Sequence, residues 1–299
     1  MTAEFRRWRI GGVTVTRIVE LGPMFLPPQG LFPAASADLV RAATWLSPCF
    51  ADGEGQINLA FQCFLVEAGG RKILVDTCIG DNKQLDIPDF SNRVSGFLET
   101  LARAGAGPDA VDTVLCTHLH FDHVGWNTRL QDGAWVPTFP NARYLFDREE
   151  VTYTMALPRQ PGDESIPQSV QPILDAGLAD LVEPTYRLCE QVRLIPTPGH
   201  TIGHVSVMIE DAGERALISG DAFHHPLQLA HPGLASTFCH DPALGEATRR
   251  RVFADLAGSP ALLIGTHFCE PTAGRVVKDG EAWRLAPVWA ERLEPAAVQ

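Results

Sequence analysis

The sequence predicts an α/β fold in which sheets are flanked by helices. Three observations lead to this class: short apolar runs typical of strands occur in both halves of the chain, segments with a helical period separate them, and turn residues end most of the runs. The strand-like runs cover residues 13–19, 59–66, 72–75, 111–116, 142–146, 192–195, 204–209, 216–219 and 261–264.

Two of the intervening helices have recognisable ends. In the first, Ser91 is the expected N-cap, Gly105 lies near the end, and the apolar positions follow the 3.6-residue period: Val94, Phe97, Leu98 and Leu101. In the second, Asp241 is the expected N-cap, Pro242 opens the first turn, and one face before Gly258 carries Val252, Phe253, Leu256 and Ala257.

The domain organisation is expected to be simple. No repeat, low-complexity tract or charge block marks a linker, so residues 1–299 are predicted to form one domain with a substantial core. Residues 21–55 stand apart because they are rich in Pro, Gly and large apolar side chains. This segment is either a long loop over a pocket or an irregular packing element, and long loops tend to be functional.

Composition narrows the range of partners. Asp and Glu outnumber Lys and Arg by 36 to 24, and the formal charge of −12 argues against a nucleic-acid partner. No run approaches the roughly 20 apolar residues that span a bilayer, and no secretory signal follows Arg6, Arg7 and Arg9, so a cytoplasmic protein without membrane partner is expected. A hydrophobic N-terminal segment could support a homodimer.

The seven cysteines do not indicate a structural framework. Their number is odd and they include no Cys-x-x-Cys pair, so neither a disulfide scaffold nor a zinc knuckle is expected.

The motif His118-Leu119-His120-Phe121-Asp122-His123 concentrates three imidazoles and a carboxylate in six residues. It follows the apolar run 111–116, so these side chains should lie at the carboxyl end of a strand, where α/β proteins commonly build sites. Imidazole and carboxylate groups are metal ligands. The motif therefore predicts a metal site.

Three more candidate ligands follow predicted strands. Each comes after a short apolar run and a glycine that lets the backbone turn: His200, Asp221 and His267. Alone, each would more often be an ordinary loop residue. Together with the six-residue motif they favour a dinuclear site.

These residues resemble those of the metallo-β-lactamase superfamily of metallohydrolases, over about residues 76–267. The resemblance implies a four-layer αβ/βα sandwich. It also implies that His118, His120 and His200 hold a first metal, that Asp122, His123 and His267 hold a second, and that Asp221 bridges the two. Asp76 matches the family's aspartate near the site and is expected to orient a ligand.

The expected cofactors are two divalent metal ions. Zinc is the first expectation, and manganese, iron or cobalt would suit the same ligands. Two cations about 3.5 to 4 Å apart can share a water and lower its pKa from 15.7 toward roughly 7, which provides hydroxide at neutral pH. Asp122 could orient this hydroxide and shuttle its proton.

Two further histidines have predicted roles near the site. His204 follows His200 by four residues but begins a strand, so a structural or orienting role is favoured over ligation. His224 stands three residues after Asp221, where lactonases of the superfamily commonly have a tyrosine. It is expected either to contact substrate or donate a proton, or to be passive.

The predicted reaction is hydrolysis of a lactone or ester of a small, hydrophobic substrate. An aspartate at the Asp221 position is typical of the thioesterase, lactonase and phosphotriesterase branches, whereas the true β-lactamases lack it. Phosphotriester hydrolysis, a sulfur dioxygenase with a single iron, and a non-catalytic metal-dependent binding protein remain alternatives. An apolar pocket wall is expected from Phe25, Phe32, Trp126, Phe223 and Phe268.

Overall fold

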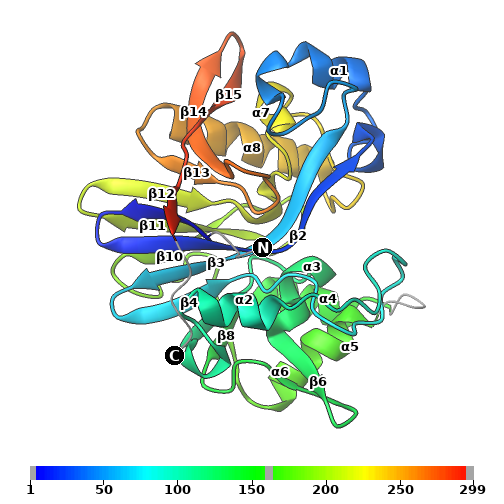
Figure 1. Ribbon diagram of the computed structural model, residues 1–299, viewed down its shortest axis with the longest axis vertical. Helices are drawn as coiled ribbons and strands as arrows, with labels where there is room; N and C mark the ends of the chain where they lie inside the picture. Colours follow the sequence, from blue (N-terminus) through cyan, green and yellow to red (C-terminus); the bar gives the residue numbers. More distant parts are fainter. Residues whose placement is uncertain (1–4, 159–163, 294–299) are drawn as a thin grey trace. The chain divides into compact units, whose positions relative to one another are not determined.

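The computed structural model describes residues 5–158 and 164–293. This part of the chain forms two compact units (Figure 1): the first contains residues 5–20, 61–158, 164–183 and 291–293, and the second contains residues 21–60 and 184–290. Each unit has its own sheet and helices, which confirms the predicted α/β class. The prediction of one continuous domain stays a prediction.

The first unit is built on an eight-stranded mixed sheet. Its order is β16-β1-β2-β3-β4-β5-β8-β9, and residues 21–26 of β2 and 57–60 of β3 continue into the second unit. The strands are β1 (Phe5–Ile10), β2 (Val13–Leu26), β3 (Ile57–Ala68), β4 (Arg71–Val75), β5 (Thr113–Leu115), β8 (Arg143–Asp147), β9 (Ala179–Val182) and β16 (Glu291–Leu293). A hairpin joins β6 (Thr128–Gln131) to β7 (Ala134–Pro137).

Neighbouring strands β4, β5, β8 and β9 run parallel. Their carboxyl ends therefore share one edge of the sheet, where the chain leaves β4 toward Asp76 and leaves β5 toward His118. The helices of this unit are α2 (Phe97–Arg103), α3 (Phe121–Val124), α4 (Arg148–Ala156), α5 (Ser165–Ser169) and α6 (Gln171–Asp175), with 3₁₀ turns η3 (Pro108–Ala110) and η4 (Gly125–Asn127).

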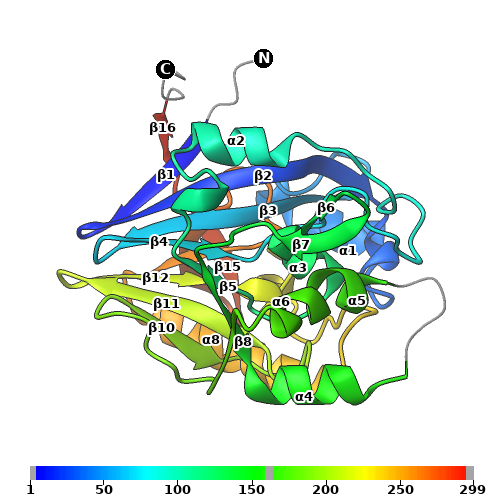
Figure 2. The same ribbon diagram turned by 90° about the horizontal axis from the view of Figure 1, so that it is seen from below.

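Helix α2 covers one face of this sheet (Figure 2). Its Phe97 and Leu101 are buried in one hydrophobic cluster with Ile18, Leu65 and Leu74 of the sheet. The helical period predicted from the sequence is thus confirmed at these two positions, because they face the core.

The predicted start of α2 is wrong. The helix begins at Phe97 after Gly96, whose φ of 74° is left-handed, and Val94 is exposed. Ser91 does not cap it, because its hydroxyl accepts from the amide of Leu85 at 3.1 Å and donates to the Lys83 carbonyl at 3.4 Å in the preceding loop. Serine hydroxyls stabilise turns as readily as helix ends.

The second unit contains a six-stranded sheet in the order β10-β11-β12-β13-β14-β15. Only the β12–β13 pair is parallel. The strands are β10 (Val192–Pro196), β11 (Val205–Asp211), β12 (Glu214–Ile218), β13 (Leu262–Ile264), β14 (Ala273–Asp279) and β15 (Ala282–Pro287).

Helix α8 (Pro242–Ala257) has the ends that the sequence predicts. The Asp241 carboxylate accepts from the amides of Ala243 at 3.0 Å and Leu244 at 2.9 Å, as an N-cap does. Its buried Phe253 belongs to the core cluster of this unit, as does Trp283 on β15. The remaining helices are α1 (Ala37–Ala42) and α7 (Leu227–Ala230), with 3₁₀ turns η1 (Pro28–Gly30), η2 (Thr44–Leu46) and η5 (Gly220–Ala222).

Segment 21–55 contains the end of β2, both N-terminal 3₁₀ turns of the second unit and α1. Several of its apolar side chains are buried, and Phe32, Leu46 and Phe50 belong to the core cluster of that unit. The role of the segment over a pocket stays a prediction. Within residues 5–158 and 164–293, no helix is both long and apolar enough to cross a membrane.

Candidate metal centre

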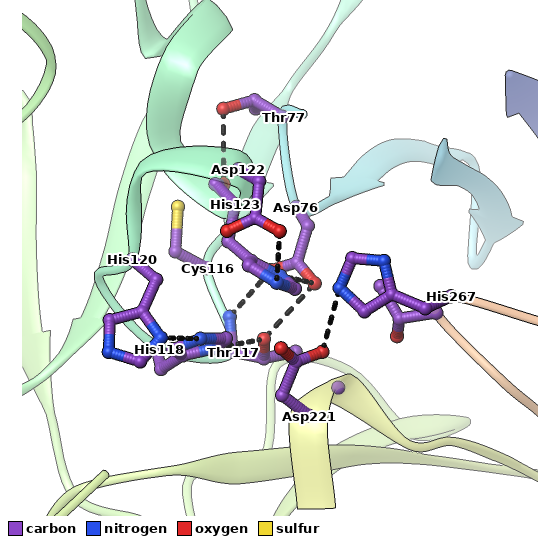
Figure 3. Close-up of polar contacts among 12 residues, drawn as sticks. Asp76, Thr77, Cys116, Thr117, His118, His120, Asp122, His123, Asp221 and His267 are labelled. Atoms are coloured by element: carbon purple, nitrogen blue, oxygen red, sulfur yellow. Dashed lines mark hydrogen bonds and ion pairs between the residues drawn. The ribbon is translucent and has the colours of Figure 1, made fainter. Parts of the chain in front are cut away.

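Four predicted ligands follow β5 closely in the first unit. His118 and His120 lie in the turn after the strand, and Asp122 and His123 lie on α3 (Figure 3). Nε2 of His118 is 3.0 Å from Nδ1 of His120, and Nε2 of His123 is 3.8 Å from Oδ2 of Asp122. The rings of His118 and His123 are 4.1 Å apart. The structure thus brings these four side chains together within one unit.

Asp76 holds this cluster from the end of β4. Its Oδ1 accepts from the Thr117 amide at 2.8 Å, and its Oδ2 accepts from the Thr117 hydroxyl at 3.0 Å and lies 2.9 Å from Nδ1 of His123 (Figure 3). Because the Thr117 hydroxyl donates to Asp76, the Nδ1 of His118, 3.1 Å from that hydroxyl, donates to it. Nε2 of both His118 and His123 is therefore unprotonated, the form that binds a metal.

A close backbone contact positions the loop that carries Asp76. Any Cβ on Gly125 would lie 1.8 Å from the Ile79 carbonyl oxygen, so only glycine fits there. The half-buried carboxylate of Glu20 accepts from the amides of Ile79 at 2.8 Å and Gly80 at 3.1 Å and from the indole of Trp126 at 2.6 Å. Burial raises the pKa of Glu20, and these donors oppose that shift.

The second unit brings together three further predicted ligands. His200 follows β10, Asp221 follows β12 in η5, and His267 follows β13. Nε2 of His267 lies 3.1 Å from Oδ1 of Asp221 (Figure 3), and Nε2 of His200 lies 3.5 Å from Oδ2. All three side chains are buried. Two imidazoles thus face the two oxygens of one carboxylate.

His204 orients Asp221 through its backbone. Its Nε2 accepts from the Asp221 amide at 2.8 Å, so its Nδ1 carries the ring proton and donates to the Thr197 hydroxyl at 2.8 Å. Both ring nitrogens are therefore engaged in the protein. This arrangement matches the structural role that the sequence favours for His204.

The other histidines of this cluster also have one nitrogen anchored. Nδ1 of His267 donates to the Ala60 carbonyl at 2.9 Å, which leaves its Nε2 unprotonated toward Asp221. Nδ1 of His200 lies 3.9 Å from Sγ of Cys239. Anchoring one ring nitrogen fixes the direction in which the other points.

His224 lies beside Asp221, and its predicted contact with substrate stays a prediction. Its Nε2 is 3.2 Å from Oδ2 of Asp221, and its side chain is buried. The adjacent His225 faces elsewhere: Nε2 donates to the Phe50 carbonyl at 2.7 Å and Nδ1 accepts from the Leu227 amide at 3.0 Å. Burial lowers the pKa of His225 to about 4, so this imidazole is neutral and structural.

The aromatic residues predicted to form a pocket wall differ in their surroundings. Trp126 stacks on Phe97 at 5.5 Å in the core of the first unit. Phe32, Phe223 and Phe268 belong to the core cluster of the second unit, whereas Phe25 is 46% exposed. Most of this set therefore packs in the cores, and the ring of Phe32 also lies edge-on to that of His224, with 6.2 Å between the ring centres.

Three residues with specific contacts in the fold have no signal in the sequence. Glu20 is a single acid inside a strand, Lys83 is a single lysine in a loop, and Cys239 is one of seven scattered cysteines. Lys83 is 1% exposed, and its amine donates to the Thr128 hydroxyl at 2.6 Å and lies 3.6 Å from the centre of the Trp135 ring. Burial lowers the pKa of Lys83 to about 6. Tertiary contacts alone identify such residues.

The donor set of each unit fits a divalent cation. Imidazole nitrogens and carboxylate oxygens are the ligands that zinc and related metals accept. In the first unit Nε2 of His118 and Nδ1 of His120 lie 3.0 Å apart, and in the second a buried carboxylate has an imidazole beside each oxygen. Clusters of buried unprotonated imidazoles around a carboxylate are costly unless a positive charge joins them.

Comparisons with known proteins agree with this chemistry. Residues 62–267 match the family model of the metallo-beta-lactamase superfamily. The chain is 31% identical over 166 residues to the N-acyl homoserine lactonase AiiA of Bacillus thuringiensis subsp. kurstaki. That match covers 52% of this chain, and the chain spans only 60% of the length of this curated relative.

Solved structures resemble the whole chain. The hydrolase AbOPH, of the beta lactamase superfamily, superposes with a TM-score of 0.80 at 25% identity and covers 97% of this chain and 99% of its own. AidC, a dizinc quorum-quenching lactonase solved with a product, has a TM-score of 0.76 at 20% identity and covers 95% of this chain and 97% of its own. These similarities confirm the predicted fold class. Because the family model matches more than two thirds of the sequence, the chain belongs to the metallo-beta-lactamase superfamily.

Proposed function

We propose that the protein is a metal-dependent hydrolase that opens a lactone or cleaves an ester of a small, hydrophobic substrate. The observation that carries the proposal is the position of Asp221, whose two carboxylate oxygens face Nε2 of His267 at 3.1 Å and Nε2 of His200 at 3.5 Å. A carboxylate with a different imidazole beside each oxygen is suited to bridge two cations. The similarity to named lactonases and hydrolases supports the reaction class.

The proposed ligand set follows the family pattern. One cation would be held by His118, His120 and His200, the second by Asp122, His123 and His267, and Asp221 would bridge them. All seven residues lie within the matched region 62–267. Zinc is the first choice of metal for these nitrogen and oxygen ligands.

Two such cations would supply Lewis acidity and lower the pKa of water in the site. The chain's own side chains would transfer the proton and orient the ligand imidazoles. Asp122, beside Nε2 of His123, would accept the proton that the attacking water loses and return it to the alkoxide released when the acyl C–O bond breaks. Asp76 and Thr117 would keep His123 and His118 in the required tautomer.

The substrate is proposed to be a small molecule. The formal charge of −12 repels a nucleic-acid backbone, whereas a neutral lactone or ester is not affected. Carbonyl and phosphoryl oxygens both gain negative charge during attack, so phosphotriesters are a second substrate class for the same ligand set.

The test combines metal analysis with a substrate screen. We expect two divalent cations per chain by elemental analysis, and turnover of hydrophobic lactones or aryl esters above that of phosphotriesters and β-lactams. Asp221→Ala should lose metal and rate together, whereas Asp279→Ala, which removes an exposed carboxylate of β14, should lose neither. A single iron per chain with oxygen consumption would indicate a dioxygenase in place of a hydrolase. Two cations per chain without turnover of any substrate class would indicate a binding protein.

A further inference from the structure

His224 is a buried histidine whose ring lacks the usual partners. It is 4% exposed, and among the residues that the structure describes neither of its ring nitrogens has a hydrogen-bond partner. Its amide, in contrast, donates to Oε1 of Gln228 at 2.7 Å, which fixes the backbone. A buried polar group without a hydrogen bond is costly and requires an explanation, such as an ion that completes its surroundings.

The ring points at a carboxylate oxygen that already faces another imidazole. Nε2 of His224 lies 3.2 Å from Oδ2 of Asp221, and Nε2 of His200 lies 3.5 Å from the same oxygen. The rings of His200 and His224 are 4.7 Å apart and inclined at 71°. All three donor atoms lie within 4.8 Å of one another.

These separations are those expected for ligands of one cation. Zinc to nitrogen and zinc to oxygen bonds of about 2.0 to 2.2 Å at tetrahedral angles place neighbouring ligand atoms roughly 3.3 Å apart. The three residues come from one unit and from two loops, and each side chain is buried. The trio therefore has the chemistry, the spacing and the shielding of a coordination site.

We propose that Nε2 of His224 is a protein ligand, together with His200 and Asp221, of one of the two divalent cations. This inference rests on the proposed function, and it assigns His224 to the cation on the His200 side because the imidazoles of both residues face Oδ2. Nδ1 of His224 then carries the ring proton. Ligation replaces the substrate contact or proton donation expected from the sequence.

A physical consequence follows for the binding of the two cations. With the ligand set proposed above, the cation on the His200 side would have four imidazole ligands and the other cation two, so the first should bind more tightly and leave more slowly when a chelator is added. The additional ligand also takes a coordination position that would otherwise be filled by water or substrate. The two sites should therefore separate in a metal titration.

The experiment measures metal binding without substrate. His224→Phe keeps an aromatic ring of similar shape next to Phe32 but has no nitrogen, and His224→Ala removes the ring. His231→Phe serves as the matched control, since His231 lies on the same segment and is only partly buried. For each protein, the two dissociation constants are measured by competition with a chromophoric chelator, and the visible spectrum is recorded with cobalt(II).

We expect both His224 variants to bind the tighter cation at least about tenfold more weakly and to show an altered cobalt(II) absorption intensity. His231→Phe should resemble the parent protein in both readouts. Circular dichroism of each metal-free variant identifies any loss of folding. If His224→Ala is unfolded, the test of the proposal is the result for His224→Phe.

Unchanged dissociation constants and an unchanged cobalt(II) spectrum in His224→Phe would overturn the assignment, and a fall in turnover alone would then return His224 to a substrate contact. Failure of the parent protein to bind two cations is a different result. It would remove the proposed function itself, so the two failures are distinguishable.

Discussion

Nδ1 of His123 lies 2.9 Å from Oδ2 of Asp76, and neither side chain is accessible to solvent. The carboxylate also accepts from the amide and the hydroxyl of Thr117, so three donors converge on it. This arrangement allows only one tautomer of His123, with the proton on Nδ1 and the lone pair of Nε2 available to a metal. Asp76 is therefore a positioning residue for the proposed ligand.

Replacing Asp76 by Ala should weaken metal binding about 10- to 100-fold, because groups that orient ligand imidazoles typically contribute that much. The unfolding midpoint in urea should also fall, since three buried donors lose their acceptor. Chelator competition and urea denaturation measure the two effects. Asp109→Ala removes an exposed carboxylate of the same unit and should change neither quantity. Parent-like metal affinity in the Asp76 variant would contradict the orienting role.

The close approach of Gly125 to Ile79 gives a second prediction. A methyl group at position 125 would meet the Ile79 carbonyl oxygen at 1.8 Å, so one of the two loops must move. We expect Gly125→Ala to lower the free energy of unfolding by about 1–3 kcal/mol or more, as overpacking does. Gly53→Ala is the control, because nothing lies within 4 Å of its added methyl group. Equal urea midpoints for the two variants would show that the loops move apart without cost.

Cys239 leads to a third prediction. Its Sγ lies 3.9 Å from Nδ1 of His200 and 3.4 Å from the Ser236 hydroxyl, so the thiol can hold this ring nitrogen in place. Cys239→Val should lower the affinity for metal roughly tenfold, whereas Cys239→Ser, which still accepts a hydrogen bond, should retain most of it. Cys189→Val is the matched control, since that cysteine is also partly buried. The idea fails if the valine and serine variants of Cys239 bind metal equally well.

Lys83 gives a prediction about pH. Its pKa falls from an ordinary value of 10.5 to about 6 on folding, because burial disfavours the charged amine. Between these two values the unfolded chain binds a proton that the folded chain has released, so stability rises with pH across this window and levels off below pH 6. For one titrating group, the free energy of unfolding cannot change by more than about 1.4 kcal/mol per pH unit.

The measurement is the free energy of unfolding in urea at several pH values from 6 to 9. Lys83→Met should remove this part of the pH dependence, and the difference from the parent protein isolates the contribution of Lys83. Lys278→Met is a close control, because the Lys278 amine also lies over a tryptophan ring, 4.2 Å from that of Trp283, but is exposed. Parallel curves for the parent and the Lys83 variant would show that the amine stays charged in the folded protein.

Much of the fold and of the candidate metal centre could be predicted because local patterns encode them. Helix α8 shows two such patterns: the residues that begin a helix, Asp241 and Pro242, and a helical period of apolar residues that includes the buried Phe253. The proposed ligands could be named for a similar reason: four of them belong to the compact motif 118–123, and the other three follow short apolar strands.

What the sequence did not reveal depends on contacts between distant residues. Glu20 is 59 residues from Ile79 in the chain, and its role exists only because the fold brings the two together. The start of α2 was mistaken since Ser91 has the side chain of a cap but uses it in a loop. Likewise, only the folded structure shows that the ring of His224 is buried without a hydrogen bond to any residue that the structure describes.

The anchoring of one nitrogen on each of His118, His123 and His267 has a thermodynamic consequence for ion uptake. A free imidazole must give up rotational freedom when it coordinates, at about 0.5–1.5 kcal/mol for each immobilised side chain. Here that ordering is completed while the polypeptide folds, through Thr117, Asp76 and the Ala60 carbonyl. A cation would therefore bind to imidazoles that are already ordered, and its affinity would not be reduced by a loss of their side-chain entropy.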